Sequence, residues 1–257
     1  MRRKPCLLLL LFSAIMTLLA GCGTSRAEKI TREFDELLQA EVSAESVRSA
    51  NDFLRGSLKG LDPEQAGALL LALEEYALAY DSAALDYREM IGEYEGEIPE
   101  YMTGLFEFKA IEQESPIISG AALQVSWAEL LHRTQGIEDF IVMHRGEEAI
   151  KEDALWLYRR HVNAVLMGAS NSPIFDYSTH KFSAEAKALY EAYASERPDT
   201  TLAWALTEYR RYLEGMDYAL AYEQKEDSAK FFDTCSRIVS EAERLVYSED
   251  RQGAEKP

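Results

Sequence analysis

The residues with the clearest potential for chemistry are Glu129 and His132, which are three positions apart. On a helix this spacing places a carboxylate and an imidazole on the same face, as in the Glu-x-x-His pairs that hold the metals of di-iron helical bundles. Such a site requires a second pair, and none of His144, His161 and His180 has an acidic residue three positions before it. Glu129 and His132 are therefore weak candidates for metal ligands. An ordinary polar helix edge is the favoured interpretation, and no cofactor is expected.

Residue patterns typical of catalysis are lacking in the chain. The sequence contains no Gly-rich phosphate-binding loop, no Gly-x-Ser-x-Gly nucleophile elbow and no His-Glu-x-x-His zinc motif. His161 and Cys235 each fall on an apolar stripe with helical spacing. This favours a hydrogen-bonded position at the edge of the core for His161, and packing in the core for Cys235, over acid–base or thiol chemistry. We therefore predict no catalytic residue. A non-enzymatic role is favoured, and an enzyme stays open as an alternative.

The beginning of the chain has the character of a targeting segment. A basic start, Arg2 to Lys4, precedes an apolar run from Cys6 to Leu19 that ends in small residues. The run is about 14 residues long, whereas a helix that spans a bilayer needs about 20. Residues 1–21 are therefore predicted to be a signal peptide that is removed.

The end of this segment, Leu19-Ala20-Gly21-Cys22, resembles the lipobox of bacterial prolipoproteins. The resemblance implies that the Cys22 thiol receives a diacylglyceryl group, that a peptidase cleaves between Gly21 and Cys22, and that the new N-terminus is often acylated. It also implies a membrane anchor and an extracytoplasmic location, at the cell surface or in the periplasm. Residues 22–26 would then form a short lipid tether.

The charge of the chain restricts its partners. The sequence holds 27 Lys and Arg against 45 Asp and Glu, for a net charge of -18. Removal of a leader with three basic and no acidic residues lowers this to -21 in the mature chain. Nucleic acid and acidic polymers are therefore poor partners.

The composition after the leader predicts an all-α fold. From residue 22 onward there are 31 Ala and 24 Leu against 8 Val and 11 Ile. With Cys6 removed and Cys22 lipidated, Cys235 has no disulfide partner, so an apolar core must stabilise the fold. We expect an antiparallel helical bundle or stacked helical hairpins in a single domain over 27–248, followed by a polar disordered tail over 249–257.

Capping residues and 3.6-residue periodicity locate the helices. At the start of the longest one, Asp62 can cap and Pro63 has no amide hydrogen to leave unpaired. Along the same predicted helix Tyr80, Tyr87 and Tyr94 recur every seven residues, which favours a seam between helices over an aromatic groove for a ligand. The ambiguous segment 137–144 is assigned to helix, because one strand cannot form a sheet. The predicted helices are 26–41, 44–59, 63–94, 102–113, 116–134, 147–167, 184–196, 200–223 and 228–248.

The loop at 169–182 is the best place to look for a binding site. Fourteen residues is long for a connection between helices, and such loops are usually functional or packed as caps. Its apolar residues Ile174, Phe175, Tyr177 and Phe182 form the candidate partner surface.

These observations predict a lipid-anchored extracytoplasmic bacterial lipoprotein that acts as a non-catalytic binding or scaffold protein of the cell envelope. The expected partners are the membrane, through lipidated Cys22, and an envelope protein or polymer. Two alternatives stay open: an extracytoplasmic enzyme or metal-binding helical protein, and an accessory substrate-capture subunit of a transporter. The transporter alternative agrees with the anchor but less well with the fold, because such receptors are usually built of two α/β lobes.

Overall fold

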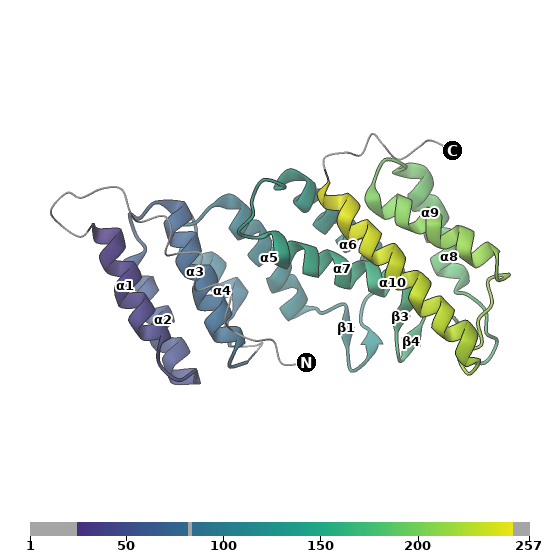
Figure 1. Ribbon diagram of the computed structural model, residues 1–257, viewed down its shortest axis with the longest axis horizontal. Helices are drawn as coiled ribbons and strands as arrows, with labels where there is room; N and C mark the ends of the chain where they lie inside the picture. Colours follow the sequence, from purple (N-terminus) through teal and green to yellow (C-terminus); the bar gives the residue numbers. More distant parts are fainter. Residues whose placement is uncertain (1–24, 82–83, 249–257) are drawn as a thin grey trace.

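The computed structural model describes residues 25–81 and 84–248 of the chain. The predicted signal peptide, Cys22 and the predicted polar tail lie outside these residues. The described part contains ten α-helices and two short β-hairpins (Figure 1). The helices are α1 (Arg26–Leu38), α2 (Ala44–Ser57), α3 (Pro63–Leu78), α4 (Tyr87–Tyr94), α5 (Glu100–Glu114), α6 (Trp127–Met143), α7 (Lys151–Met167), α8 (Ala184–Glu196), α9 (Thr201–Glu214) and α10 (Lys225–Tyr247). The strands are β1 (Ile118–Ser119), β2 (Ala122–Leu123), β3 (Gly168–Ala169) and β4 (Ser172–Pro173).

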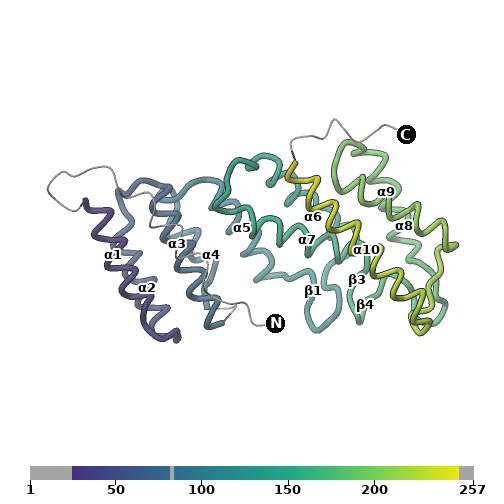
Figure 2. Tube along the Cα trace, in the orientation of Figure 1, coloured from purple at the N-terminus to yellow at the C-terminus, as the bar shows by residue number. Residues whose placement is uncertain are grey.

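The helices are stacked side by side along an elongated molecule (Figure 2). Helices α1 and α2 lie at one end, and α8 and α9 lie at the other (Figure 1). Neighbours in sequence are mostly neighbours in space, as in the pairs α1 with α2, α4 with α5, α6 with α7 and α8 with α9. Helix α10 returns along α7 and α9 and covers both. The prediction of an all-α fold of bundled or stacked helical hairpins is confirmed.

Side-chain caps start five helices within one residue of the predicted positions, namely α1, α2, α3, α8 and α9. Asp62 accepts a hydrogen bond from the Glu64 amide at 3.1 Å, and Pro63 occupies the first turn of α3. Ser25 and Glu28 form a reciprocal capping box at the start of α1. Because these contacts join residues two or three positions apart, they are readable from local sequence.

The predicted helix over 63–94 is wrong, since the structure divides it into α3 and α4. Asp86 caps a new helix by accepting from the Glu89 amide at 3.0 Å. The predicted tyrosine seam is divided as well. Tyr80 is exposed, whereas Tyr87 and Tyr94 are buried on α4. Their hydroxyls donate to Glu74 of α3 and Asn51 of α2, and so hold α4 against two earlier helices.

The predicted helix over 116–134 is also wrong, because its first part is the hairpin of β1 and β2. Gly120 and Ala121 both have positive φ, of 57° and 64°, as a tight two-residue hairpin turn requires. Helix α6 begins only after the cap at Ser126, and it continues through 137–143 as the sequence predicts. A second hairpin, β3 with β4, follows α7. The two hairpins are joined by the Asn171 amide, which donates to the Ala121 carbonyl at 2.7 Å.

The predicted helix over 200–223 is shorter in the structure. Helix α9 ends at Glu214, and residues 215–224 form a loop that leads into α10. Asp217 and Tyr218 in this loop both have φ of 52°, so the helical backbone cannot continue through them.

A buried carboxylate joins three helices in the C-terminal half. Glu138 of α6 is 1% exposed and accepts hydrogen bonds from the amides of Thr201 and Leu202, at 2.6 Å and 2.8 Å. It also accepts one from the hydroxyl of Tyr158 on α7 at 2.9 Å. The first amides of a helix have no partner within the helix, and their partial positive charge favours an anion. Glu138 therefore fixes the start of α9 against α6 and α7.

A partly buried group of ion pairs joins α3, α5 and α7. Lys109 of α5 lies 2.5 Å from Glu74 of α3 and 2.6 Å from Asp153 of α7. Glu74 is 3% exposed, and it also accepts from the Tyr87 hydroxyl. Because a buried charge is costly unless it is paired, this arrangement specifies how α3, α5 and α7 meet.

Over residues 25–81 and 84–248, none of the helices is both long enough and apolar enough to cross a bilayer.

We expect Glu138→Ala to lower the free energy of unfolding by about 3 kcal/mol, since three buried donors lose their acceptor. Urea denaturation followed by circular dichroism measures the change. Glu196→Ala is the matched control, because this glutamate is exposed in the last turn of α8. Its cost should stay below about 1 kcal/mol. Equal losses in the two variants would show that Glu138 does not organise the three helices.

Candidate functional site

The loop between α7 and α8 is paired with the loop between α9 and α10. The Phe182 amide donates to the Tyr218 carbonyl at 3.0 Å, and the Leu220 amide donates to the His180 carbonyl at 2.8 Å. Lys181 and Ala219 form an isolated antiparallel bridge between these contacts. The loop at 169–182 is therefore fixed by a partner segment some 40 residues further along the chain.

Three non-glycine residues in the paired loops have a strained backbone conformation. His180, Asp217 and Tyr218 have φ of 59°, 52° and 52°, in the left-handed region that non-glycine residues avoid. Each such residue costs about 1 kcal/mol, so the surrounding contacts must enforce the conformation. Here the enforcing contacts are the hydrogen bonds between the two loops.

Asp176 organises the turn that carries Tyr177. Its Oδ1 accepts from the amides of Ser178 and Thr179, at 3.0 Å and 2.7 Å, and from both of their hydroxyls, at 2.7 Å and 2.9 Å. The Ser178 hydroxyl and the Thr179 donors lower the pKa of Asp176 to about 2. The carboxylate is thus ionised at neutral pH, and it holds the turn in one conformation.

Three of the four apolar residues in the predicted partner surface belong to the core. Ile174, Phe175 and Phe182 are 1%, 0% and 8% exposed. The Phe175 ring packs edge-on against Phe182 and Phe231, with centroids 5.3 Å and 5.4 Å away. Phe182 also packs against Tyr190 of α8 and Tyr209 of α9, so these residues belong to the core that α8, α9 and α10 share. The candidate surface in this loop is therefore reduced to Tyr177.

Tyr177 belongs to a larger aromatic face, which we define as Tyr177, Tyr222 and Phe232. Tyr177 is 57% exposed and Phe232 is 45% exposed, with the half-buried Tyr222 between them. The ring centroids of Tyr177 and Tyr222 are 5.2 Å apart, and those of Tyr222 and Phe232 are 6.3 Å apart. The aromatic face is thus a continuous row of three rings drawn from two loops and α10.

Sequence reasoning missed Tyr222 and Phe232. Phe231 and Phe232 are adjacent on a helix, so when the first faces the core the second points away from it. This signal is readable in principle, although it does not show that Phe232 meets a tyrosine from another loop. The contact between Phe232 and Tyr222 depends on the pairing of the two loops.

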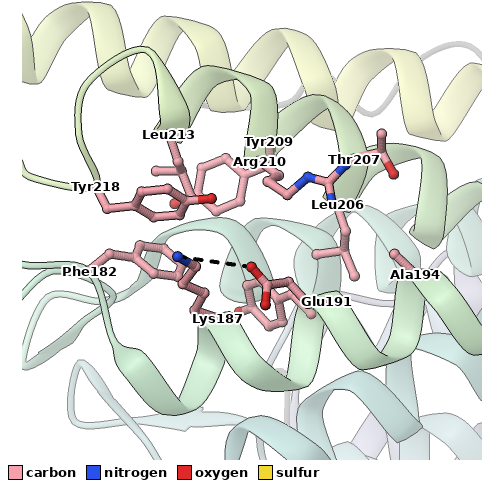
Figure 3. Close-up of a pocket in the computed structure, with 11 residues that line it drawn as sticks. Phe182, Lys187, Glu191, Ala194, Leu206, Thr207, Tyr209, Arg210, Leu213 and Tyr218 are labelled. Carbon is pink, nitrogen blue, oxygen red and sulfur yellow. Dashed lines mark ion pairs between the residues drawn. The ribbon is translucent and has the colours of Figure 1, made fainter.

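A narrow cleft lies between α8 and α9 (Figure 3). Phe182 and Tyr218 line one end, and the Lys187 ammonium lies 4.0 Å from the Tyr218 ring centroid. Lys187 also pairs with Glu191 at 4.0 Å. The cleft encloses about 20 Å³, which is far below the volume of a typical small-molecule site. The exposed aromatic face is therefore the better candidate for binding.

The predicted metal candidates are not brought together with further ligands. Glu129 pairs with Arg133 at 2.7 Å, and His132 is exposed. Within the described ranges, no group of three or more His, Cys, Asp and Glu side chains could hold a metal ion. The geometry around Glu129 is that of an ion pair at a helix edge.

The other two residues considered for chemistry are buried. His161 is 1% exposed, with Nε2 lying 3.2 Å from Glu112 and Nδ1 lying 2.9 Å from the Leu157 carbonyl. Cys235 is fully buried, and burial raises the pKa of its thiol to about 12. The predicted core position of Cys235 is confirmed. His161 is hydrogen-bonded as predicted, but it lies inside the core and not at its edge.

Comparisons with known proteins give no relative for this chain: no protein-family model, curated protein or solved structure matches it.

We expect the carboxyl group of Asp176 to titrate near pH 2 in the folded chain, measured by carbon NMR. Because its pKa is depressed, the contribution of Asp176 to the loop is present above the ordinary value near 3.8 and is lost as the pH falls through about 2. A midpoint near the ordinary value would contradict the arrangement of donors described above.

At neutral pH, Asp176→Ala should expose the turn to protease. Cleavage by chymotrypsin after Tyr177 should become several-fold faster. In the wild-type chain the loop can open only when the four hydrogen bonds to the carboxylate break, and the variant lacks these bonds. Asp233→Ala, at an exposed position on α10, provides the control and should leave the cleavage rate unchanged.

Proposed function

We propose that this chain is a lipid-anchored extracytoplasmic protein of the bacterial envelope that binds another envelope protein, without catalysis, through its aromatic face. The observation that carries the proposal is the exposed row of Tyr177, Tyr222 and Phe232 on fixed backbone. The lipobox-like residues 19–22 supply the anchor.

Aromatic side chains are the residues that most often dominate protein interfaces. They cover a large area with few rotatable bonds, so little conformational entropy is lost when a partner binds. Tyr177 and Phe232 are among the most exposed large apolar residues of the described chain. An exposed row of such rings is costly in water unless something covers it.

The backbone beneath the aromatic face is held in place before binding. The Asp176 carboxylate fixes the turn of Tyr177, and the paired loops fix the segment that carries Tyr222. Phe232 lies on α10, beside the fully buried Phe231. A surface that does not need to be ordered on binding retains more of its contact energy as affinity.

Charge favours a protein partner with a neutral or basic rim. The mature chain would carry -21, and the edge of the aromatic face includes Glu223, whose side chain is 67% exposed beside His180. Complementary charge at the rim would steer association, whereas the rings would supply the buried centre.

The lipid anchor is tested at Cys22. Intact-mass analysis of the purified protein should show wild-type chain that begins at residue 22 and carries a diacylglyceryl group. Cys22→Ser should lack the lipid and retain the leader, because the modified thiol is the signal for cleavage in prolipoproteins. Cys6→Ser, outside the lipobox-like residues, is the control and should be processed as wild type. Unmodified wild-type chain would contradict the anchor.

The aromatic face is tested by photo-crosslinking in intact cells. With p-benzoylphenylalanine at position 177 or 232, we expect an adduct with the same protein. The control position is 143, where Met143 is 76% exposed. The nearby Arg145 donates to the Val246 carbonyl, at the opposite end of α10 from Phe232. Tyr222→Ala should lower the yield at positions 177 and 232 several-fold, because it removes the central ring. Adducts with a polymer alone, an equal product from position 143, or no product at all would contradict a protein partner.

A further inference from the structure

A second concave surface lies on α7, separate from the aromatic face. One side of this helix presents Trp156, Arg159, Arg160 and Asn163 to a groove of about 320 Å³. Ile118 of the β1 hairpin is part of the same lining. The spacing of three and four residues places the α7 members on one helical stripe. The full lining is Ile118, Trp156, Arg159, Arg160, Asn163, Ala164, Met167 and Gly168.

The lining of this α7 groove is cationic in a strongly acidic protein. It includes two arginines and no acidic residue, although the whole chain carries -18. The carboxylates that pair with these arginines are more buried. Glu112 and Glu243 are 8% and 23% exposed, whereas the side chains of Arg160 and Arg159 are 31% and 41% exposed. The positive ends are therefore nearer to solvent than their counter-charges.

The ion pairs hold the guanidinium groups without using all of their donors. Arg159 contacts Glu243 through Nη1 at 2.8 Å, and Arg160 contacts Glu112 through Nη1 at 3.2 Å. A guanidinium carries five N–H donors in a planar fork that matches a carboxylate or phosphate group. Each arginine is thus positioned by one nitrogen and can offer others to a ligand.

Glu112 remains ionised beneath Arg160. Burial alone would raise its pKa, but the hydrogen bond from His161 and the charges of His161 and Arg160 lower it overall. Arg133 lies 3.6 Å from the same carboxylate. Since Glu112 is shared among three cationic or hydrogen-bonding partners, its charge only partly offsets that of Arg160.

The remaining lining provides a flat apolar surface beside the arginines. The Trp156 side chain is 44% exposed, and the Arg160 guanidinium lies 5.5 Å from the centroid of its ring. Met167 and Ile118 continue the apolar surface. Asn163 donates to the Arg159 carbonyl at 2.9 Å, which orients its amide at the edge of the groove.

We propose that the α7 groove binds a small organic anion whose carboxylate or phosphate meets Arg159 and Arg160 and whose planar or apolar body lies against Trp156. The volume is at the lower end of the range for small-molecule sites, about 300–1,000 Å³. The proposal does not depend on the partner of the aromatic face, because the two surfaces share no residue.

Titration calorimetry on the full purified chain tests this with three probes of one shape: 1-naphthoate, 1-naphthyl phosphate and the neutral 1-naphthalenemethanol. Both anions should bind, and the neutral alcohol should bind at least about tenfold more weakly. The anion that binds with the higher affinity identifies the acidic group that the ligand carries, and a preference for either anion supports the proposal.

Two substitutions test the contributions of charge and of the apolar surface to binding separately. Arg159→Gln should weaken both anions by about tenfold and leave the alcohol unchanged. Trp156→Leu should weaken all three probes by a similar factor, because it removes the flat surface that they share. Arg244→Gln is the matched control, since Arg244 is an exposed, ion-paired arginine on α10 outside the groove.

Three results would overturn the proposal: no heat of binding from either anion up to about 5 mM, equal affinity for the alcohol, or the same loss in Arg159→Gln and Arg244→Gln. Circular dichroism verifies that each variant is folded. If Arg159→Gln does not fold, Arg159→Lys takes its place. It keeps the charge but loses the fork, so it should weaken both anions and spare the alcohol.

Discussion

The buried carboxylate of Glu138 is the contact on which the C-terminal half of the molecule depends. It satisfies two amides at the start of α9 and the hydroxyl of Tyr158 on α7, and it does so from α6. Water cannot take the place of the carboxylate as acceptor for these donors, because Thr201 and Tyr158 are themselves buried. A single side chain thus sets the relative positions of three helices. The loops and helices that carry the aromatic face are built on those three.

Helix α7 is tied to its neighbours at its C-terminal end as well. The hydroxyl of Tyr190 on α8 donates to the Val165 carbonyl at 2.5 Å, and that of Tyr209 on α9 donates to the Leu166 carbonyl at 2.6 Å. The last carbonyls of a helix have no partner within it, so both hydroxyls satisfy groups that would otherwise be buried unpaired. The same helix presents Arg159 to the groove on its more exposed side. One rigid element therefore supports both candidate binding surfaces.

The two surfaces differ in what they can recognise. The aromatic face is a row of rings at the end of an acidic molecule, suited to covering by another protein. The α7 groove is smaller, concave and lined by guanidinium groups, which suits a compact anion. The two surfaces share no residue, so neither ligand would compete directly with the other for the same side chains.

The sequence by itself determined the helical class, the positions of most helix starts and the burial of Cys235. A cap such as Asp62 contacts an amide two residues away, and an apolar stripe repeats within a few turns, so both are written in local sequence. The lipobox-like residues are four consecutive positions, so they too are read from local sequence.

The tertiary structure alone decided where the long predicted helices break and which apolar residues stay exposed. Strands of two residues are too short to show an alternating pattern, and the β1 hairpin is held by Asn171 from a distant loop. Phe175 and Tyr177 are two residues apart in one loop, yet the first is buried and the second is exposed. Their difference depends on Phe231 and Tyr222, about 50 residues further along the chain. Two of the three partners of Glu138, the amides of Thr201 and Leu202, are likewise more than 60 residues away. Contacts at such separations follow from packing, which no local pattern in the sequence specifies.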